Sequence, residues 1–218
     1  MPSPNPSRPA RRSLRFALVA LLGASGASAP AVAGPFPVVR PFSLPPRAST
    51  LPEGEPTLAP LAFVRFCLRQ PDQCVGDGAD RITLDEAAIG DLSDVNRSVN
   101  RSIRPQRKLA SAGIGNWEIA PAAGDCNDYA LTKRHELLAR GYPASALLLS
   151  VVETRWGEGH LVLTVRTDRG DLVLDNLSAA IRPWDATGYR WIKRQSSQDP
   201  NRWVAVDLPG RTDPGVQL

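Results

Sequence analysis

Three side chains that together can carry nucleophilic catalysis occur in the second half of the chain, in the order Cys126, His160 and Asp175. Cys126 begins a run with helical character that extends to Arg140. The first turn of a helix has unpaired N–H groups and a partial positive charge, which favour a thiolate over a thiol, and the thiolate is the nucleophile. A histidine can act as the base, and a carboxylate can orient the histidine. The set predicts a cysteine hydrolase, and among hydrolases a protease fits it best.

The cysteine count separates a pair from a single residue. Cys67 and Cys74 are close in sequence, and in an oxidising compartment they are candidates for a disulfide. Cys126 is then the odd cysteine, which is typical of a reactive thiol or of an intermolecular bridge. A free cysteine can also be a small core residue, but the aspartate and asparagine neighbours of Cys126 argue against simple burial. A metal site built from the three cysteines is disfavoured because the chain has no C-x-x-C pair.

The base is identified by elimination, because the sequence contains only two histidines. His135 follows Cys126 on the same predicted helix, half a turn around it and about 13 Å along its axis. It therefore points away from the thiol, and we interpret it, with Glu136, as part of a solvated face. His160 is left as the candidate base, and Gly159 before it allows a close approach of the backbone.

Asp175 lies in an apolar run, where an unpaired carboxylate would be costly to bury. A hairpin with a two-residue loop at Arg169 and Gly170 would place Asp175 opposite Thr164. Asp175 and His160 would then share a face but lie about 13 Å apart along the strand. That separation is too large for a hydrogen bond, so the triad requires a different register of this hairpin.

The elements that must position these residues are helices followed by strands. The spacing of apolar residues predicts three helices, over Pro60–Gln70, from a capping box at Thr83–Glu86 to a point before Pro105, and from Cys126 to Arg140. Short runs rich in Val and Leu or in aromatic residues predict five strands, over Ser145–Glu153, His160–Arg166, Asp171–Leu177, Tyr189–Lys193 and Trp203–Leu208. Helices first and a sheet second indicate an α+β fold, with N-terminal helices packed on an antiparallel sheet.

The ends of the chain differ in composition from this domain. Residues 1–33 have basic residues, a short apolar segment and the cleavage signal Ala31–Ala33, which together predict a secretory signal peptide. Residues 34–58 are rich in proline and predict an extended arm or linker. The domain is then expected over residues 59–210, with a C-terminal tail at 211–218.

Charge and length narrow the possible functions. The 218 residues suffice for one globular domain. The formal net charge is +4, and the four arginines of residues 1–33 account for all of it. The remaining chain lacks the basic footprint of a nucleic-acid-binding protein. Outside the signal peptide no run is apolar for long enough to span a bilayer. We expect a monomer with no nucleic-acid partner.

Several segments resemble the bacterial transglutaminase-like cysteine proteinases. They are Gly124–Tyr129 (GDCNDY), Gly159–Leu163 (GHLVL), Val173–Leu177 (VLDNL), Phe66-Cys67, Val95-Asn96 with Val99-Asn100, and Tyr189 with the strand at Trp203. The likeness runs from about Pro60 to Leu208, so it covers the presumed domain and not the arm. It implies a papain-like transglutaminase core with Cys126, His160 and Asp175 as a Cys–His–Asp triad.

The resemblance also implies a biological setting. Well-studied members of the family are periplasmic, calcium-dependent proteases that clip large surface adhesins near their N-termini and so release biofilm cells. It therefore implies a protein substrate of the surface-adhesin class and an inner-membrane regulatory protein as a partner. Many members have a carboxylate after the cysteine that helps to bind Ca²⁺. Asn127 holds that place here and Asp125 precedes the cysteine, so these two residues are the candidate calcium ligands.

Two other functions are compatible with the same residues. The acyl group can pass to an amine instead of water, which would make the chain a transglutaminase-type acyl transferase. A periplasmic binding module could also retain the fold without activity.

Overall fold

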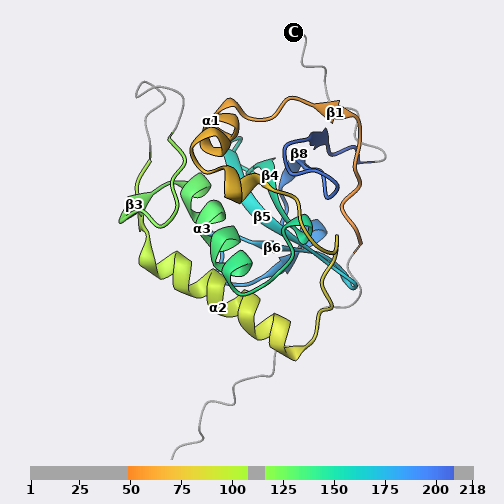
Figure 1. Ribbon diagram of the computed structural model, residues 1–218, viewed down its shortest axis with the longest axis horizontal. Helices are drawn as coiled ribbons and strands as arrows, with labels where there is room; N and C mark the ends of the chain where they lie inside the picture. Colours follow the sequence, from red (N-terminus) through yellow and green to blue (C-terminus); the bar gives the residue numbers. More distant parts are fainter. Residues whose placement is uncertain (1–48, 108–115, 209–218) are drawn as a thin grey trace, which may run out of the picture. The chain divides into compact units, whose positions relative to one another are not determined.

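The helices of this chain pack on one face of a seven-stranded sheet (Figure 1). The computed structural model describes residues 49–107 and 116–208. The predicted signal peptide, the first part of the predicted arm and the C-terminal tail lie outside these ranges. Within them the architecture is α+β with an antiparallel main sheet, so the predicted fold class is confirmed.

The α-helices of the described ranges are α1 (Leu61–Arg69), α2 (Glu86–Ser102) and α3 (Cys126–Ala139), and the 3-10 turns include η1 (Pro71–Cys74), η3 (Ala144–Ala146) and η4 (Trp184–Ala186). The predicted starts of α1 and α3 are confirmed, because α1 follows Pro60 directly and α3 begins at Cys126. The predicted capping box at Thr83 is wrong. Asp85 is the N-cap of α2, and its carboxylate accepts a hydrogen bond from the Ala88 N–H at 2.8 Å.

The main sheet has the strand order β1-β9-β8-β4-β5-β6-β7, and neighbouring strands are antiparallel. The strands are β1 (Pro56–Thr57), β4 (Leu147–Glu153), β5 (Gly159–Thr167), β6 (Gly170–Leu174), β7 (Arg182–Pro183), β8 (Arg190–Gln195) and β9 (Trp203–Ala205). A separate parallel pair, β2 (Arg104–Pro105) and β3 (Ala123–Gly124), leads into α3. The five predicted strands correspond to β4, β5, β6, β8 and β9. The two-residue strands were not predicted, because they are too short to show an alternation of apolar and polar residues.

The turn between β5 and β6 differs from the predicted one. The predicted turn was a two-residue loop at Arg169 and Gly170. In the structure Thr167 pairs with Gly170, so Asp168 and Arg169 form the turn. Gly170 has a φ of 107°, a conformation that side-chain-bearing residues rarely adopt, and this fixes it as the first residue of β6.

The corrected turn changes the position of Asp175. Thr164 lies opposite Val173 and not opposite Asp175, so the pairing is shifted by two residues from the predicted register. Strand β6 also ends at Leu174, three residues earlier than predicted, and Asp175 begins the loop that follows. Both changes bring Asp175 toward His160 at the other end of β5.

The main hydrophobic core lies between the helices and the sheet. Its buried residues from the helices include Phe63, Phe66, Leu92, Val95, Val99, Tyr129 and Leu137. The apolar face predicted for α2 is therefore a core face. A smaller cluster on the other side of the sheet contains Leu51, Val152, Val162, Val173 and Trp191.

Cys67 and Cys74 form the predicted disulfide. The S–S distance is 2.11 Å and the Cα atoms are 5.7 Å apart. The bond links α1 to η1, and it leaves Cys126 as the free cysteine of the chain.

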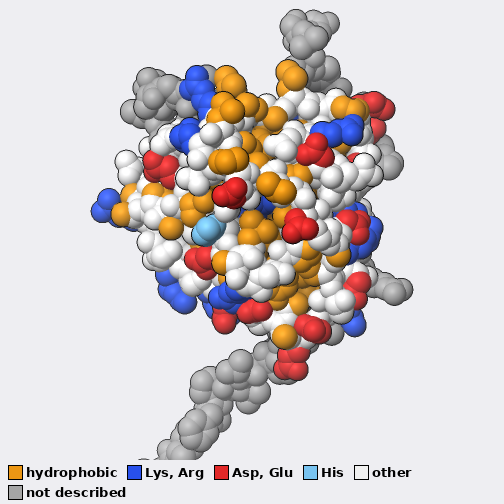
Figure 2. Space-filling view, viewed as in Figure 1, with side chains coloured by type: hydrophobic (Ala, Val, Ile, Leu, Met, Phe, Trp, Pro, Cys, Tyr) orange, Lys and Arg blue, Asp and Glu red, His pale blue; other side chains and the backbone are white. Residues whose placement is uncertain are grey.

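The outer side of α1 is apolar. Leu61, Val64 and Leu68 are exposed on it, and Figure 2 shows apolar side chains gathered over this helix. Among the residues that the structure describes, no helix combines the length and the apolar character that crossing a membrane requires.

Candidate active site

Cys126 is the first residue of α3, and its neighbours fix that helix start. Asp125 is the N-cap, and its Oδ1 accepts a hydrogen bond from the Asn127 N–H at 3.1 Å. Asp128 completes the capping box, because its Oδ2 accepts from the Asp125 N–H at 2.9 Å. A Cβ atom on Gly124 would lie 2.3 Å from this carboxylate oxygen, so the position requires glycine. The Cys126 sulfur is therefore held at the end of the helix where the dipole favours negative charge.

Asp128 also holds the chain segment that comes before the cysteine. It is fully buried, and its Oδ1 accepts a hydrogen bond from the Glu118 N–H at 2.9 Å. One turn further along α3, the Thr132 hydroxyl accepts from the Ala120 N–H at 2.8 Å. These two bonds attach the segment to α3, and Trp117 within it lines the same hollow as the cysteine.

His160 is the second residue of β5 and is buried beside the cysteine. Its Nε2 lies 2.8 Å from Asp175 Oδ1. Cys126 lines the same two hollows as His160 and is near enough to raise the pKa of the imidazole, and since Nε2 is used by Asp175, Nδ1 is the nitrogen left for the sulfur. The other histidine, His135, is exposed on α3, as the sequence predicts.

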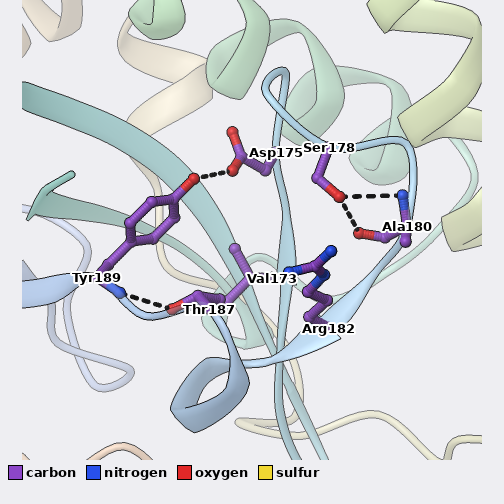
Figure 3. Close-up of a pocket in the computed structure, with 7 residues that line it drawn as sticks. All are labelled: Val173, Asp175, Ser178, Ala180, Arg182, Thr187 and Tyr189. Carbon is purple, nitrogen blue, oxygen red and sulfur yellow. Dashed lines mark hydrogen bonds between the residues drawn. The ribbon is translucent and has the colours of Figure 1, made fainter. Parts of the chain in front are cut away.

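Asp175 is buried, with both carboxylate oxygens in hydrogen bonds. Oδ1 accepts from the Leu177 N–H at 3.0 Å and also contacts His160, while Oδ2 accepts from the Tyr189 hydroxyl (Figure 3). The Asn100 amide on α2 donates to the backbone carbonyl of Asp175 at 2.9 Å. The carboxylate is thus fixed in one orientation toward the imidazole.

The electrostatics of the pair favour a charged imidazole. Burial by itself would lower the pKa of His160, but the hydrogen bonds and the negative charges of Asp175 and Cys126 raise it to about 9. Burial would raise the pKa of Asp175, but the hydrogen bond and charge of His160, with the donors Tyr189 and Leu177, hold it below its ordinary value. At neutral pH the site therefore holds an imidazolium between a carboxylate and the cysteine sulfur.

Two hollows meet at Cys126 and His160. The larger, of about 700 Å³, has a mixed wall whose polar residues include Gln106, Arg107, Thr154, Glu158 and Asn176. The smaller, of about 280 Å³, has a mostly apolar wall that includes Pro60, Trp117, Val151 and Leu161. A peptide segment that lies across the sulfur would contact both walls.

A family model described as the bacterial transglutaminase-like cysteine proteinase BTLCP matches residues 53–210. The chain belongs to this family. It is therefore a cysteine peptidase, and the α+β arrangement described above is the transglutaminase-like core of the family. The resemblance noted in the sequence is confirmed over nearly the whole described part of the chain.

Solved structures of Legionella pneumophila LapG are similar to this chain. One shares 21% identity over 56% of this chain and 69% of LapG, with a TM-score of 0.46. The calcium-bound form shares 21% identity over 62% and 77%, with a TM-score of 0.48. The EGTA-treated form shares 22% identity over 54% and 67%, with a TM-score of 0.46. A search of curated proteins finds no match.

The candidate calcium ligands of this BTLCP member, Asp125 and Asn127, lie side by side. The Asn127 side-chain amide donates a hydrogen bond to Asp125 Oδ1 at 3.0 Å, and the Asn127 N–H donates to the same oxygen. The Asn127 amide donates through its nitrogen, so its Oδ1 stays available as an uncharged oxygen ligand beside the Asp125 carboxylate. Within the described ranges, no group of three or more His, Cys, Asp or Glu side chains is placed to hold a metal ion.

Tyr189 is a residue of the site for which the sequence predicted no role. Tyr189 lies just before β8, and its ring meets that of His160 edge-on, with 5.7 Å between the centroids. Burial and the Asp175 charge raise the pKa of the Tyr189 hydroxyl, so it stays protonated and donates to Asp175. No local motif marks this role, because the contact depends on how the chain folds back between β6 and β8.

We expect Tyr189→Phe to lower kcat/KM by about three- to tenfold, because it removes one charge-assisted hydrogen bond from Asp175. The ring of phenylalanine keeps the contact with His160, so the free energy of unfolding should change little. Steady-state hydrolysis of a peptide substrate measures the effect. Tyr142→Phe is the matched control, because the Tyr142 hydroxyl donates to Asp91, a residue outside the site. An unchanged kcat/KM for Tyr189→Phe would show that this hydroxyl does not position Asp175.

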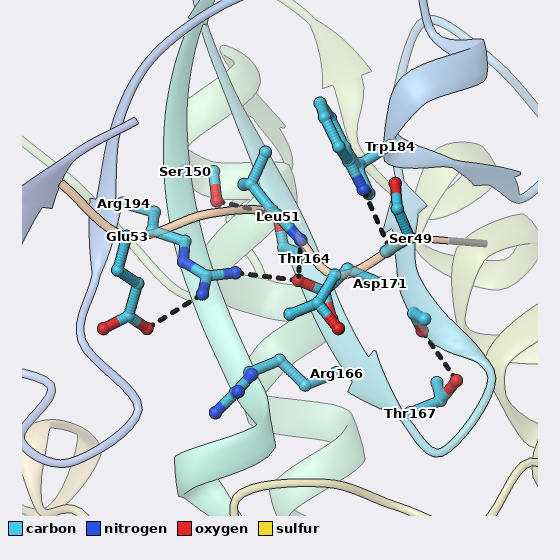
Figure 4. Close-up of polar contacts among 12 residues, drawn as sticks. Ser49, Leu51, Glu53, Ser150, Thr164, Arg166, Thr167, Asp171, Trp184 and Arg194 are labelled. Carbon is cyan, nitrogen blue, oxygen red and sulfur yellow. Dashed lines mark hydrogen bonds and ion pairs between the residues drawn. The ribbon is translucent and has the colours of Figure 1, made fainter. Parts of the chain in front are cut away.

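Residues 49–57, which we call the strap, contact Trp184 in the segment that leads to Tyr189 (Figure 4). The Trp184 indole N–H donates to the Ser49 carbonyl at 2.9 Å. The Leu51 N–H donates to Asp171 Oδ2 at 2.9 Å, and Leu51 is buried in the smaller hydrophobic cluster. The described part of the predicted arm therefore packs on the sheet, where it covers the face opposite the helices.

A buried ion pair fastens the strap to the sheet. Arg194 on β8 lies between Asp171 on β6, at 2.8 Å, and Glu53 of the strap, at 2.8 Å. Arg194 and Asp171 are almost fully buried, whereas a third of the Glu53 side chain is exposed.

We expect Asp171→Asn to lower the free energy of unfolding by about 2–3 kcal/mol, because a buried guanidinium loses its buried counter-charge. Glu53→Gln should cost about 1 kcal/mol or less, since solvent screens that carboxylate. Urea denaturation measures both values. Equal losses in the free energy of unfolding for the two variants would contradict the expectation that the buried carboxylate contributes more than the exposed one.

Proposed function

We propose that this cysteine peptidase hydrolyses peptide bonds through a triad of Cys126, His160 and Asp175. The observation that carries the proposal is the buried imidazole of His160, which is hydrogen-bonded to Asp175 at 2.8 Å and lines the same hollows as Cys126 at a helix start. The base thus lies between the nucleophile and the orienting group, which is the arrangement that acyl transfer requires.

The mechanism follows from these positions. The Cys126 thiolate attacks the carbonyl carbon, and the oxygen that becomes negative is stabilised by the Cys126 backbone N–H at the start of α3. The His160 imidazolium gives its proton to the amine as the C–N bond breaks, which leaves an acyl-enzyme. Neutral His160 then takes a proton from water as the water attacks the thioester. The C–S bond breaks, and the acid product and the thiolate–imidazolium pair result.

Asp175 acts on the histidine in this scheme. It accepts the Nε2–H of His160 and so directs Nδ1 toward the sulfur and the leaving amine. Its own orientation is held by Tyr189, Leu177 and Asn100, none of which contacts the reacting atoms.

The substrate we propose is an extended segment of a cell-surface protein. The two hollows on either side of the sulfur support binding of a peptide across it. The predicted signal peptide at residues 1–33 supports export to the periplasm, where such a substrate would be met. A surface adhesin as substrate and an inner-membrane regulatory protein as partner remain proposals that rest on the family resemblance.

We expect weak calcium binding, because Asn127 contributes no charge beside Asp125 and calcium affinity follows the charge of the ligands. Asn127→Asp should bind Ca²⁺ about tenfold more tightly, since the cation would relieve the repulsion of two adjacent carboxylates. Isothermal titration with CaCl₂, and with MgCl₂ as the control, measures the difference. Equally tight binding by the unmodified chain would contradict the expectation.

The experiment that tests the proposed function separates hydrolysis from its two alternatives. The full-length chain is incubated with casein and a fluorescent primary amine, with and without prior treatment with iodoacetamide. We expect new peptide N-termini, little incorporation of the amine, and loss of both after alkylation of Cys126. Incorporation of the amine without new N-termini would indicate an acyl transferase. No reaction of any kind, together with a Cys126 that iodoacetamide does not label, would indicate an inactive binding module.

A further inference from the structure

A separate pocket of about 360 Å³ opens next to the triad, on the side of Tyr189. Its wall is formed by the β4–β5 turn, by the loop after β6 and by the loop before β8. Leu177 lines both this pocket and the larger hollow that contains Cys126 and His160, so the pocket adjoins that hollow. A peptide that crosses the sulfur can therefore extend into the pocket.

The charged residues of the pocket wall are two arginines, Arg155 and Arg182, and no aspartate or glutamate lines it. Neither guanidinium forms an ion pair with a residue that the structure describes. Glu153 and Glu158, on the same hairpin as Arg155, are already paired with other arginines. The pocket therefore presents two positive charges that no carboxylate of the described chain neutralises.

Both guanidinium groups are placed for a ligand. The Arg155 guanidinium stacks on the ring of Trp156, with 4.4 Å between its Cζ and the centroid, and this contact restricts its position. Arg182 lines the pocket, and Figure 3 shows it at the small neighbouring cavity that it also lines together with Asp175 and Tyr189. Arg182 does not hydrogen-bond to Asp175, and a cavity of about 30 Å³, enough for about one water molecule, is lined by both residues.

The rim of the pocket is apolar and exposed. Trp156 is 67% exposed and Leu177 is 56% exposed, so neither side chain is explained by packing in the core. Exposed aromatic and arginine side chains around a hollow are typical of surfaces that bind a protein segment. The combination of an apolar rim and a basic interior favours a segment with an acidic side chain next to an apolar one.

We propose that this pocket is a substrate subsite that accepts an Asp or Glu side chain within a few residues of the cleaved bond. Arg155 and Arg182 bind the carboxylate, and Trp156 and Leu177 contact the adjoining apolar part of the segment. The inference rests on the proposed proteolysis and adds a substrate class to it. An arginine fork binds a carboxylate through two parallel hydrogen bonds, which explains why both cations are arginines and not lysines.

The test uses a library of tryptic peptides from a bacterial proteome, digested by the full-length chain and analysed by mass spectrometry. We expect Asp or Glu to be enriched at one position near the cleaved bond. For a pair of synthetic peptides with Glu or Gln at that position, kcat/KM should favour Glu by about fivefold. The double variant Arg155→Gln/Arg182→Gln should lose this preference, and Arg182→Glu should favour Lys at the same position.

The matched control is Arg169→Gln, which removes one positive charge from the exposed β5–β6 turn at the other end of the strand. It should retain the preference for Glu. A library cleaved in a Cys126-dependent way without any acidic enrichment, or a double variant that still prefers Glu, would overturn the subsite and leave the proteolysis intact. A library that shows no Cys126-dependent cleavage would overturn the proposed function, and the subsite with it.

Discussion

Cys126→Ala is expected to lower kcat/KM by about 10⁴-fold or more, because it removes the atom that forms the acyl-enzyme. His160 and Asp175 cannot compensate, since neither is placed to attack the carbonyl without the sulfur. Hydrolysis of a peptide found in the casein digest measures the loss. The substitution should leave the fold intact, because Cys126 is only partly buried and the helix start is fixed by Asp125 and Asp128.

Cys126→Ser tests the chemistry of the sulfur separately. Serine keeps the size of the side chain and suits the first turn of a helix, but its hydroxyl is a much weaker nucleophile at neutral pH. We expect it to be nearly as inactive as the alanine variant, with a similar Tm. Because Cys67 and Cys74 are joined, labelling of the unmodified chain by iodoacetamide should occur at Cys126 alone. Hydrolysis by Cys126→Ala within tenfold of the unmodified chain would rule out the proposed mechanism.

Asp175→Ala is expected to lower kcat/KM by about 10²–10³-fold, because His160 loses the acceptor that fixes its orientation and stabilises its charge. Asp175→Asn should lower kcat/KM by a smaller factor. The amide oxygen can still accept from His160 Nε2 and the Leu177 N–H, and the Tyr189 hydroxyl can rotate to accept from the amide nitrogen. The difference in kcat/KM between the two variants separates the orienting effect of residue 175 on His160 from the effect of its negative charge. Asp72→Asn, which makes the same charge change on the exposed η1 turn, is the control.

The same two variants should change the pH dependence. The mechanism requires imidazolium, and His160 carries its proton below a pKa of about 9, so hydrolysis should decline as pH rises through about 9. Without the Asp175 carboxylate, its hydrogen bond and charge no longer oppose burial, so the pKa of His160 should fall below about 9. The alkaline limb of the kcat/KM profile should therefore move to lower pH in both variants. An alkaline limb that stays near pH 9 in Asp175→Ala would show that Asp175 does not set the charge of the base.

The first part of the site could be predicted from the sequence because its determinants are local. Gly124, Asp125 and Asp128 mark a helix start on either side of Cys126, and capping is decided within one turn of chain. His160 could be selected because His135 falls on the opposite face of the same helix as the cysteine. The disulfide was predicted for a similar reason, since Cys67 and Cys74 are joined by a short turn.

The distance between His160 and Asp175 could not be predicted in this way. It depends on the register of β5 and β6, and the expected turn at Arg169 and Gly170 gave a separation that excluded the contact. The structure forms the turn at Asp168 and Arg169 instead. A shift of one residue in a turn moves the strand pairing by two, and nothing in the local sequence distinguishes the two turns strongly.

The sequence by itself determined the order of helices and strands, the disulfide and the residues at which a nucleophile and a base would stand, because each follows from spacing within a few residues. Only the tertiary structure decided that Asp175 reaches His160, that Tyr189 holds Asp175, and that Arg155 and Arg182 face one pocket. These contacts join segments from different strands and loops. They are set by the sheet register and by side-chain packing, which local sequence patterns do not specify.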